Sequence, residues 1–219
     1  VAAGTVDIVA ITTAEYFVPR LLAAVGRRYP DIRFRLSVVN RAEVHAMLTE
    51  RRVAVAIMGT PPNNLPVQSI PFAPHPLSFV AAPDHLLAGK PDILPGSLVE
   101  ERLLLRERGS GTRDHLERYL KSHGVSPLRA DEMGSNETLK QAAMAGLGIA
   151  FLSHHTFAME VETGRLVRLD VQGTPVVREW NVVVRSDQTL SLAVRTLLEF
   201  LQSEGVGLMG EAPMDVVDR

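Results

Sequence analysis

The sequence predicts an α/β protein built from two similar lobes, and three observations lead to this prediction. Residues 6–58 read as strand, helix, strand, helix and strand, an alternation that is typical of a parallel sheet. Residues 103–155 repeat the same alternation. The stretch between them, residues 65–95, is rich in proline and is interpreted as the crossing from the first lobe to the second.

The first lobe begins with residues 6–11, whose nearly continuous apolar and β-branched character predicts a buried strand. Thr12 and Glu15 have the spacing of a capping box, and the apolar residues that follow recur at helical spacing until a proline ends the pattern. Two further strands are predicted at 34–39 and 53–58, with a short amphipathic helix between them.

The rest of the chain repeats these elements. Further strands are predicted at residues 77–82, 103–105, 129–133, 149–152, 166–169 and 180–184. Helices are predicted at 113–122, over Leu139 to Leu147, and over Ala193 to Leu201. The expected boundaries are 1–79 with 183–205 for lobe I, 80–182 for lobe II, and 206–219 for a frayed tail.

Composition narrows the function classes. The chain has 219 residues, no cysteine and a net charge of −2. The missing cysteines exclude disulfides, thiol nucleophiles and cysteine metal sites, and the charge gives no global basic field for nucleic acid or an anionic membrane. No apolar run approaches the length of a spanning helix and no signal peptide is visible, so we expect a cytoplasmic protein without membrane contact.

The turn at residues 106–113 is a candidate site for binding an anion. It joins a predicted strand to a predicted helix and contains Gly, Ser and Thr between arginines. Ser110 and Thr112 are both good N-cap residues, and an N-terminus of this kind aims backbone N–H groups at a phosphate or carboxylate. An ordinary turn with a solvated basic edge explains this stretch alone at least as well.

Polar residues follow each predicted strand of the first lobe, at Thr12–Thr13, Asn40–Arg41 and Gly59–Thr60. The carboxyl ends of parallel strands share one edge, where open α/β sheets bind ligands. In the second lobe, Gly111 and Asn136 occupy matching points of neighbouring units, so two helix N-termini are expected to face one cleft. Each tip of the first lobe taken alone is better explained as a plain turn or cap, and the prediction depends on three such tips sharing one edge.

The histidines predict no metal site. His75 and His85 lack a second ligand at metal spacing and are interpreted as surface or turn residues. The adjacent side chains of His154 and His155 diverge at a helix start, and no carboxylate cluster accompanies them. We therefore expect structural or solvent-facing roles for this pair.

Four stretches together resemble the effector-binding domain of LysR-type transcriptional regulators. They are residues 56–62, 82–88, 106–113 and 134–153. The resemblance covers roughly residues 4 to 205, and it is specific because the four motifs occur in this order and at this spacing. Within the family the chain is most similar to regulators of the Rubisco operon, a likeness carried by residues 17–22, 71–77 and 164–166.

The resemblance implies two Rossmann-like lobes of the type II periplasmic-binding-protein fold, joined by two crossover strands, with an effector in the cleft between the lobes. It also implies a homodimer or homotetramer, and DNA binding through an N-terminal winged helix-turn-helix that is expected to lie outside this chain. The expected effector is a small anion: a phosphorylated sugar, a phosphoenolpyruvate-like acid or NADPH. No cofactor or metal is expected, and neither a P-loop ending nor a GxGxxG motif is present.

The family's effector positions fall on twelve residues of this sequence. They are Thr12, Thr13, Asn40, Arg41, Gly59, Ser110, Gly111, Thr112, Arg113, Ser135, Asn136 and Ser153. Arg41 and Arg113, near helix N-termini, suit an anionic ligand.

The sequence thus predicts a ligand-sensing domain of a DNA-binding regulator of carbon-fixation genes and not an enzyme. A transport-type solute-binding protein would share the two-lobed fold and is the first alternative. The second is an α/β enzyme acting on a phosphorylated sugar, although no GxSxG elbow, metal cluster or paired His–carboxylate pattern supports it.

Overall fold

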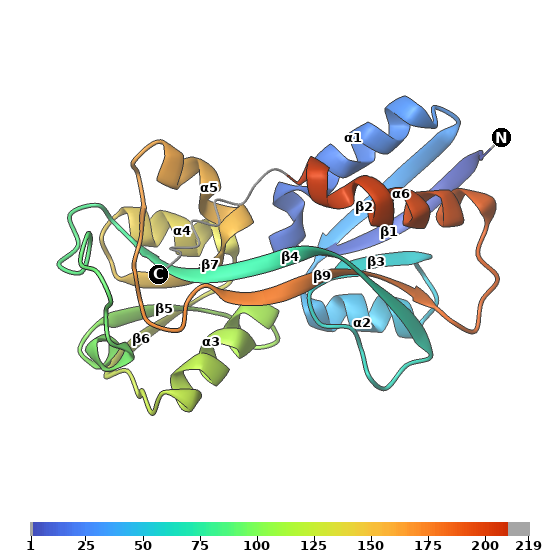
Figure 1. Ribbon diagram of the computed structural model, residues 1–219. Coiled ribbons are helices and arrows are strands. Elements are labelled where there is room, and N and C mark those ends of the chain that lie inside the picture. The colour runs from blue at the N-terminus through green and yellow to red at the C-terminus, as the bar shows by residue number, and fades with distance from the viewer. Residues whose placement is uncertain (1, 210–219) are drawn as a thin grey trace. The chain divides into compact units, whose positions relative to one another are not determined.

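The computed structural model describes residues 2–209 (Figure 1). The chain divides into two compact units, the first formed by Val1–Pro74 with Glu179–Arg219 and the second by His75–Arg178. Two long strands, β4 (Val67–Ala81) and β9 (Val176–Arg185), each contain one of these boundaries and so contribute residues to both units. Across residues 2–209, no helix has the length and apolar character needed to cross a membrane.

The first unit is a mixed sheet with helices on both faces. Its further elements are β1 (Gly4–Ile11), the 3-10 turn η1 (Thr12–Tyr16), α1 (Val18–Arg28), β2 (Ile32–Val39), α2 (Arg41–Thr49), β3 (Val55–Met58) and α6 (Leu192–Leu208). The strand order is β2-β1-β3-β9-β4. Strand β1 is parallel to both of its neighbours, and β9 runs antiparallel to β3.

Alternation along β1 explains how this sheet is covered. Val6 and Ile8 pack with α1 and α6 on one face, while Val9, the residue after Ile8, packs with Val44 and Leu48 of α2 on the other. Successive side chains of a strand point to opposite faces, so a strand with buried apolar residues on both faces requires helices on both sides. Figure 1 shows this arrangement within the first unit, with α1 and α6 on one face of the strands and α2 on the other.

The second unit repeats the plan. Its elements are the 3-10 turn η2 (Pro95–Val99), β5 (Arg102–Arg106), α3 (Gly111–Ser122), β6 (Arg129–Met133), α4 (Asn136–Met144), β7 (Ile149–Ser153), α5 (His154–Glu162) and β8 (Val167–Arg168). The strand order is β4-β7-β5-β6, and β8 pairs with β4. Strand β5 is parallel to β6 and β7, and β4 is antiparallel to β7.

Two apolar clusters form the core of the second unit, one on each face of its sheet. Leu103 of β5 packs with Leu116 and Leu120 of α3. Leu104, the next residue, belongs to the opposite cluster with Leu139 of α4 and members of α5. As in the first unit, the period of two along a buried parallel strand assigns one helix layer to each face.

The start of the first helix differs from the prediction. Thr12 and Glu15 do not form the capping box of a long helix, because Thr12 opens the short turn η1 and α1 begins only at Val18, with Phe17 as its N-cap. Pro19 at the second helical position explains the later start. A proline is compatible with the first helical turn but cannot donate a hydrogen bond within the helix.

The proline-rich crossing also differs from the prediction, because β4 begins at Val67 rather than at Leu77. The strand thus includes Pro71, Pro74 and Pro76. Its pairing with β7 runs only from Leu77 to Val80, so the prolines lie outside that hydrogen-bond ladder. At the C-terminal end, α6 continues through Gly207 to Leu208, where fraying was predicted; the remainder of the predicted tail lies outside the described residues.

Candidate functional site

Three helices of the second unit begin at one edge of its sheet. The parallel strands β6, β5 and β7 are neighbours, and each is followed by a helix, respectively α4, α3 and α5. The N-cap residues of these helices are Ser135, Ser110 and Ser153. Because backbone N–H groups and the positive end of the helix dipole lie at each N-terminus, this edge favours negatively charged groups.

The beginning of α3 has polar groups that can hydrogen-bond to a ligand. Ser110 and Thr112 are buried, and Ser110 makes no side-chain cap hydrogen bond although its backbone has the extended N-cap conformation. Gly111, between them, borders open space, since a Cβ atom built on it would meet nothing within 4 Å. The backbone N–H groups of this first turn are therefore available to an incoming acceptor.

The beginning of α5 is similar. The Oγ of Ser153 and the Oγ1 of Thr156 are buried and have no hydrogen-bond partner among residues 2–209. A buried hydroxyl without a partner costs free energy, so two of them at one helix start require an explanation. A ligand that accepts their hydrogen bonds would supply it.

A buried lysine lies close to the same helix start. The Nζ of Lys140 donates to the backbone oxygen of Thr156 at 3.3 Å and pairs with Glu160 at 2.7 Å and Glu137 at 3.1 Å. Two carboxylates therefore compensate the ammonium group. We interpret Lys140 as a link between α4 and α5 that fixes the position of the α5 N-terminus.

Arg106, which is not among the site residues predicted from the sequence, contacts Asn136 in the structure. The Arg106 side chain is buried, donates to both carboxylate oxygens of Glu107 at 2.8 and 2.9 Å, and donates to the Oδ1 of Asn136. A charged residue at the last position of a buried strand was the available signal. The guanidinium fixes the first residue of α4 beside the end of β5.

Arg113 is already engaged by the protein. Its Nε donates to Glu117 at 2.8 Å, its Nη1 donates to the backbone oxygen of Arg106 at 3.0 Å, and it also pairs with Glu132. The hydrogen bond to Glu117, followed by the pairing with Glu132, raises the pKa of Arg113 above its usual value against the effect of burial. Its side chain thus holds α3 against the ends of β5 and β6, whereas the sequence suggested a direct contact with the anion.

The predicted residues of the first unit also lie at strand ends. Thr12 and Thr13 follow β1 directly, and Thr13 is buried. Asn40 follows β2 and caps α2 through its side chain, with Arg41 as the first helical residue, and Gly59 follows β3. Since β2, β1 and β3 are parallel neighbours, these five residues lie along one edge of this unit. That both edges contact one ligand stays a prediction.

His75 is buried, whereas the sequence suggested a surface or turn position; His154 and His85 each have a polar side-chain partner. The Nε2 of His154 lies 2.8 Å from the Oγ of Ser78 on β4, which agrees with the structural role expected for it. Burial lowers the pKa of His154 to about 4 and lowers that of His75 well below its usual value. The Nε2 of His85 lies 3.3 Å from the Oε2 of Glu101. Among residues 2–209, no three His, Cys, Asp or Glu side chains are grouped so that they could hold a metal ion.

The two-unit α/β fold, with polar helix starts at the carboxyl ends of its strands, defines a ligand-binding domain. The chain matches the family described as "LysR substrate binding domain" over residues 1–205, and it belongs to that family. Individual relatives show which members of this family the chain is similar to. The regulator CbbR of Rhodospirillum rubrum is 43% identical over 201 residues, which are 92% of this chain and 66% of the relative.

Two other relatives give the same result. CbbR of Xanthobacter flavus is 44% identical over 96% of this chain and 64% of its own length, and the RuBisCO operon transcriptional regulator of Allochromatium vinosum is 41% identical over 93% of this chain and 68% of its own. The similarity to Rubisco-operon regulators predicted from the sequence is confirmed. The chain spans about two thirds of the length of these relatives.

Solved structures confirm the fold. The regulatory domain of CcmR from Synechocystis, solved in complex with 2-PG, has a TM-score of 0.88 and 34% identity, and the match covers 95% of this chain and 98% of that one. The effector-binding domain of QuiR, in complex with shikimate, has a TM-score of 0.82 at 16% identity. These neighbours support the predicted type II periplasmic-binding-protein-like fold.

Proposed function

We propose that this chain is the metabolite-sensing domain of a LysR-type transcriptional regulator that controls carbon-fixation genes. The observation that carries the proposal is the row of three helix N-termini in the second unit. There Ser110, Thr112 and Ser153 are buried, Ser110 makes no side-chain cap hydrogen bond, and the Ser153 hydroxyl has no partner among residues 2–209. Such an edge is suited to an anion. The relatives are transcriptional regulators and not enzymes, which favours a sensor over an enzyme acting on a phosphorylated sugar.

The effector class follows from the same groups. Backbone N–H groups and hydroxyls donate hydrogen bonds without requiring a particular carbon skeleton, so they select for the anionic group of the ligand. The similar CcmR domain is in complex with 2-PG, a small anionic metabolite. Phosphorylated sugars, phosphoenolpyruvate-like acids and NADPH remain the candidates for this chain, with 2-PG as the first probe.

The experiment is a calorimetric titration of the purified chain with 2-PG. We expect Ser153→Ala and Thr112→Val to weaken 2-PG binding by about ten- to a hundredfold each, because each loses a hydrogen bond to a charged group. Each variant removes one buried hydroxyl and little volume. The control is Thr163→Val, which removes an exposed hydroxyl at the other end of α5, where it bonds the carbonyl of Met159 at 2.7 Å.

Equal 2-PG affinity in all three variants and the parent chain would contradict the proposal that 2-PG binds at the strand edge of the second unit. Circular dichroism and thermal unfolding without ligand verify that the variants remain folded. If 2-PG does not bind, the same titration is repeated with a sugar phosphate and with NADPH. Binding at 100 times the dissociation constant raises the unfolding free energy by about 2.7 kcal/mol, which a thermal-shift measurement detects.

In the whole protein the effector acts by shifting a population of conformations. An effector that binds one arrangement of the two units more tightly favours that arrangement, and the change passes to a homodimer or homotetramer. DNA binding is assigned to an N-terminal domain outside this chain. Footprinting of the full-length protein on its promoter, with and without 2-PG, tests this: an effector-dependent change in the footprint is expected, and a footprint that never responds to a bound effector contradicts it.

A further inference from the structure

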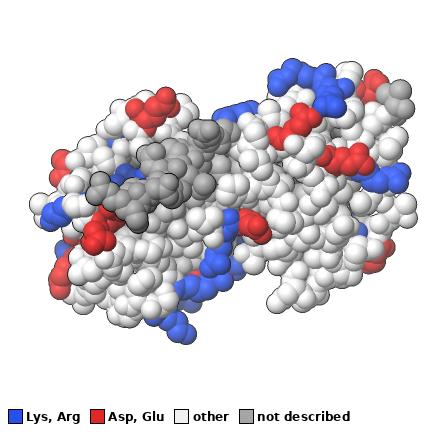
Figure 2. Space-filling model, in the orientation of Figure 1, with Lys and Arg blue, Asp and Glu red and all other residues white. Residues whose placement is uncertain are grey.

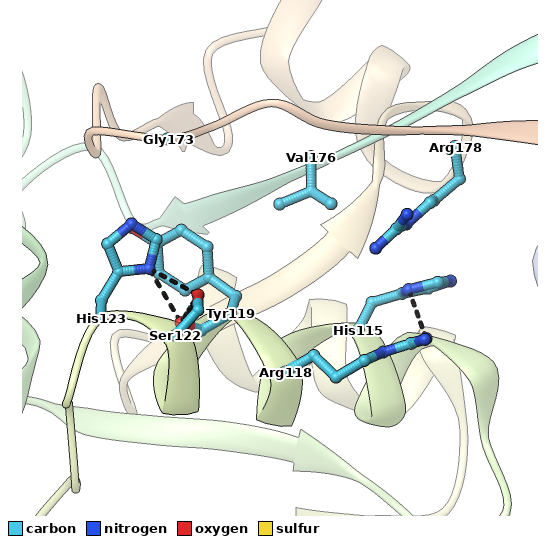
Figure 3. Close-up of a pocket in the computed structure, with 8 residues that line it drawn as sticks. All are labelled: His115, Arg118, Tyr119, Ser122, His123, Gly173, Val176 and Arg178. Carbon is cyan, nitrogen blue, oxygen red and sulfur yellow. Dashed lines mark hydrogen bonds between the residues drawn. The ribbon is translucent and has the colours of Figure 1, made fainter.

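A pocket lies on the flank of α3, within the second unit. It has a volume of about 310 Å³, and its lining comes from the middle and end of α3 and from residues 173–178, which lead into β9. Figure 3 shows the side chains of His115, Arg118 and Arg178 at one end and those of Tyr119 and His123 at the other. None of the twelve site residues predicted from the sequence lines it. This pocket is therefore separate from the strand edge described above.

The pocket carries positive charge that no carboxylate among residues 2–209 neutralises. Arg118 donates to the backbone oxygen of Asp114 at 3.2 Å and approaches the Nδ1 of His115 at 2.9 Å, and neither contact supplies a negative charge. Arg178 has an exposed side chain. Across residues 2–209, neither arginine forms an ion pair, and no carboxylate lines the pocket. Figure 2 shows Lys and Arg side chains gathered over α3.

The other end of the pocket is held in place by hydrogen bonds and ring packing. The hydroxyl of Tyr119 donates to the backbone oxygen of Gln172 at 2.5 Å, and its ring packs against that of His123 with centroids 4.3 Å apart. The Nδ1 of His123 lies 2.9 Å from the carbonyl of Tyr119, so this nitrogen is the donor. The Nε2 of His123 is directed toward Gly173, where an added Cβ would lie 3.2 Å away.

We propose that this pocket is a second anion site of the chain, and that it binds a phosphate monoester of a small metabolite. Two guanidinium groups that have no carboxylate partner within residues 2–209 match a doubly charged phosphate, which arginine recognises through paired hydrogen bonds. The rings of Tyr119 and His123 and the side chain of Val176 supply the surface for the carbon skeleton. The volume of about 310 Å³ is at the lower end for ligand pockets, which favours a small phosphorylated metabolite over a dinucleotide.

The proposal is tested by NMR titration of the isotope-labelled chain with inorganic phosphate. We expect the amide signals of residues 115–123 and 173–178 to shift. In the double variant Arg118→Gln/Arg178→Gln, phosphate binding at these residues is expected to weaken at least about tenfold per arginine removed, because each substitution removes a charge-assisted contact. The control variant, Lys121→Gln, removes one positive charge from an exposed position of α3 that does not line the pocket.

The outcomes separate this site from the strand edge. Loss of the phosphate response in the double variant, with Lys121→Gln unchanged, supports the pocket. Equal weakening in Lys121→Gln indicates a general charge effect and overturns the proposal. Loss in Ser153→Ala with no loss in the double variant assigns the phosphate to the strand edge and also overturns it, while the proposed function stands. Unperturbed spectra of the ligand-free variants verify that they are folded.

Discussion

Gly148→Ala is expected to lower the free energy of unfolding of this chain by about 3 kcal/mol. Gly148 directly precedes β7, whose first residue, Ile149, pairs with Leu103 of β5. A Cβ atom at position 148 would collide with the backbone carbonyl oxygen of Arg102 on the neighbouring strand. A backbone carbonyl in a sheet cannot rotate away as a flexible side chain can, so β5 and β7 must move apart.

The matched control is Gly96→Ala in the turn η2. A Cβ atom there would meet nothing within 4 Å, and the residue is exposed. We expect this variant to stay within about 0.5 kcal/mol of the parent chain, as most surface substitutions do. Urea unfolding followed by circular dichroism measures both variants. Equal stability of Gly148→Ala and Gly96→Ala would show that β5 and β7 do not approach each other as closely as the structure has them.

Lowering the pH from about 7.5 to about 5 is expected to reduce the stability of the chain, with His154 alone contributing about 2 kcal/mol. Burial lowers the pKa of His154 from 6.5 to about 4. Between these two pKa values the unfolded chain binds a proton that the folded chain excludes. The contribution of neutral His154 to the free energy of unfolding is therefore fully present above about pH 6.5, and it decreases as the pH falls from there toward 4. The buried His75, whose pKa is also lowered, acts in the same direction.

The variant His154→Gln tests the assignment. Glutamine keeps a polar group near the Oγ of Ser78 but does not titrate. The variant is expected to be less stable than the parent chain at neutral pH, and its stability should fall by about 2 kcal/mol less over the same pH interval. Urea unfolding at several pH values measures both. A pH dependence that is unchanged in His154→Gln would mean that the imidazole is accessible to protons in the folded chain.

Local sequence patterns were sufficient to predict the bounds of a strand or helix whose apolar residues recur at the period of that element. The strand predicted at 129–133 is β6 to the residue, and the helix predicted to end at 122 ends there. Prediction was less successful where distant segments determine the outcome. The prolines of β4 suggested a broken crossing, yet the strand is continuous through them, and its ladder with β7 begins only after the last of them.

The same division applies to the candidate sites. The polar residues after the strands were found from the sequence, since strand ends and helix caps are local features. The burial of Arg106 against Asn136 and the engagement of Arg113 with Glu132 were not found, because these contacts join residues 30 and 19 positions apart in the chain. The pocket beside α3 was missed for the same reason, since Arg118 and Arg178 are sixty residues apart in the chain.

The sequence by itself determined the α/β alternation, the family and the strand ends that carry polar groups, because periodicity, capping preference and ordered motifs are properties of short stretches. Only the tertiary structure decided which charges are neutralised and which remain available to a ligand. Neutralisation depends on distances between side chains that folding alone brings together. For this reason Arg113 pairs with two carboxylates, whereas Arg118 and Arg178 pair with none among residues 2–209.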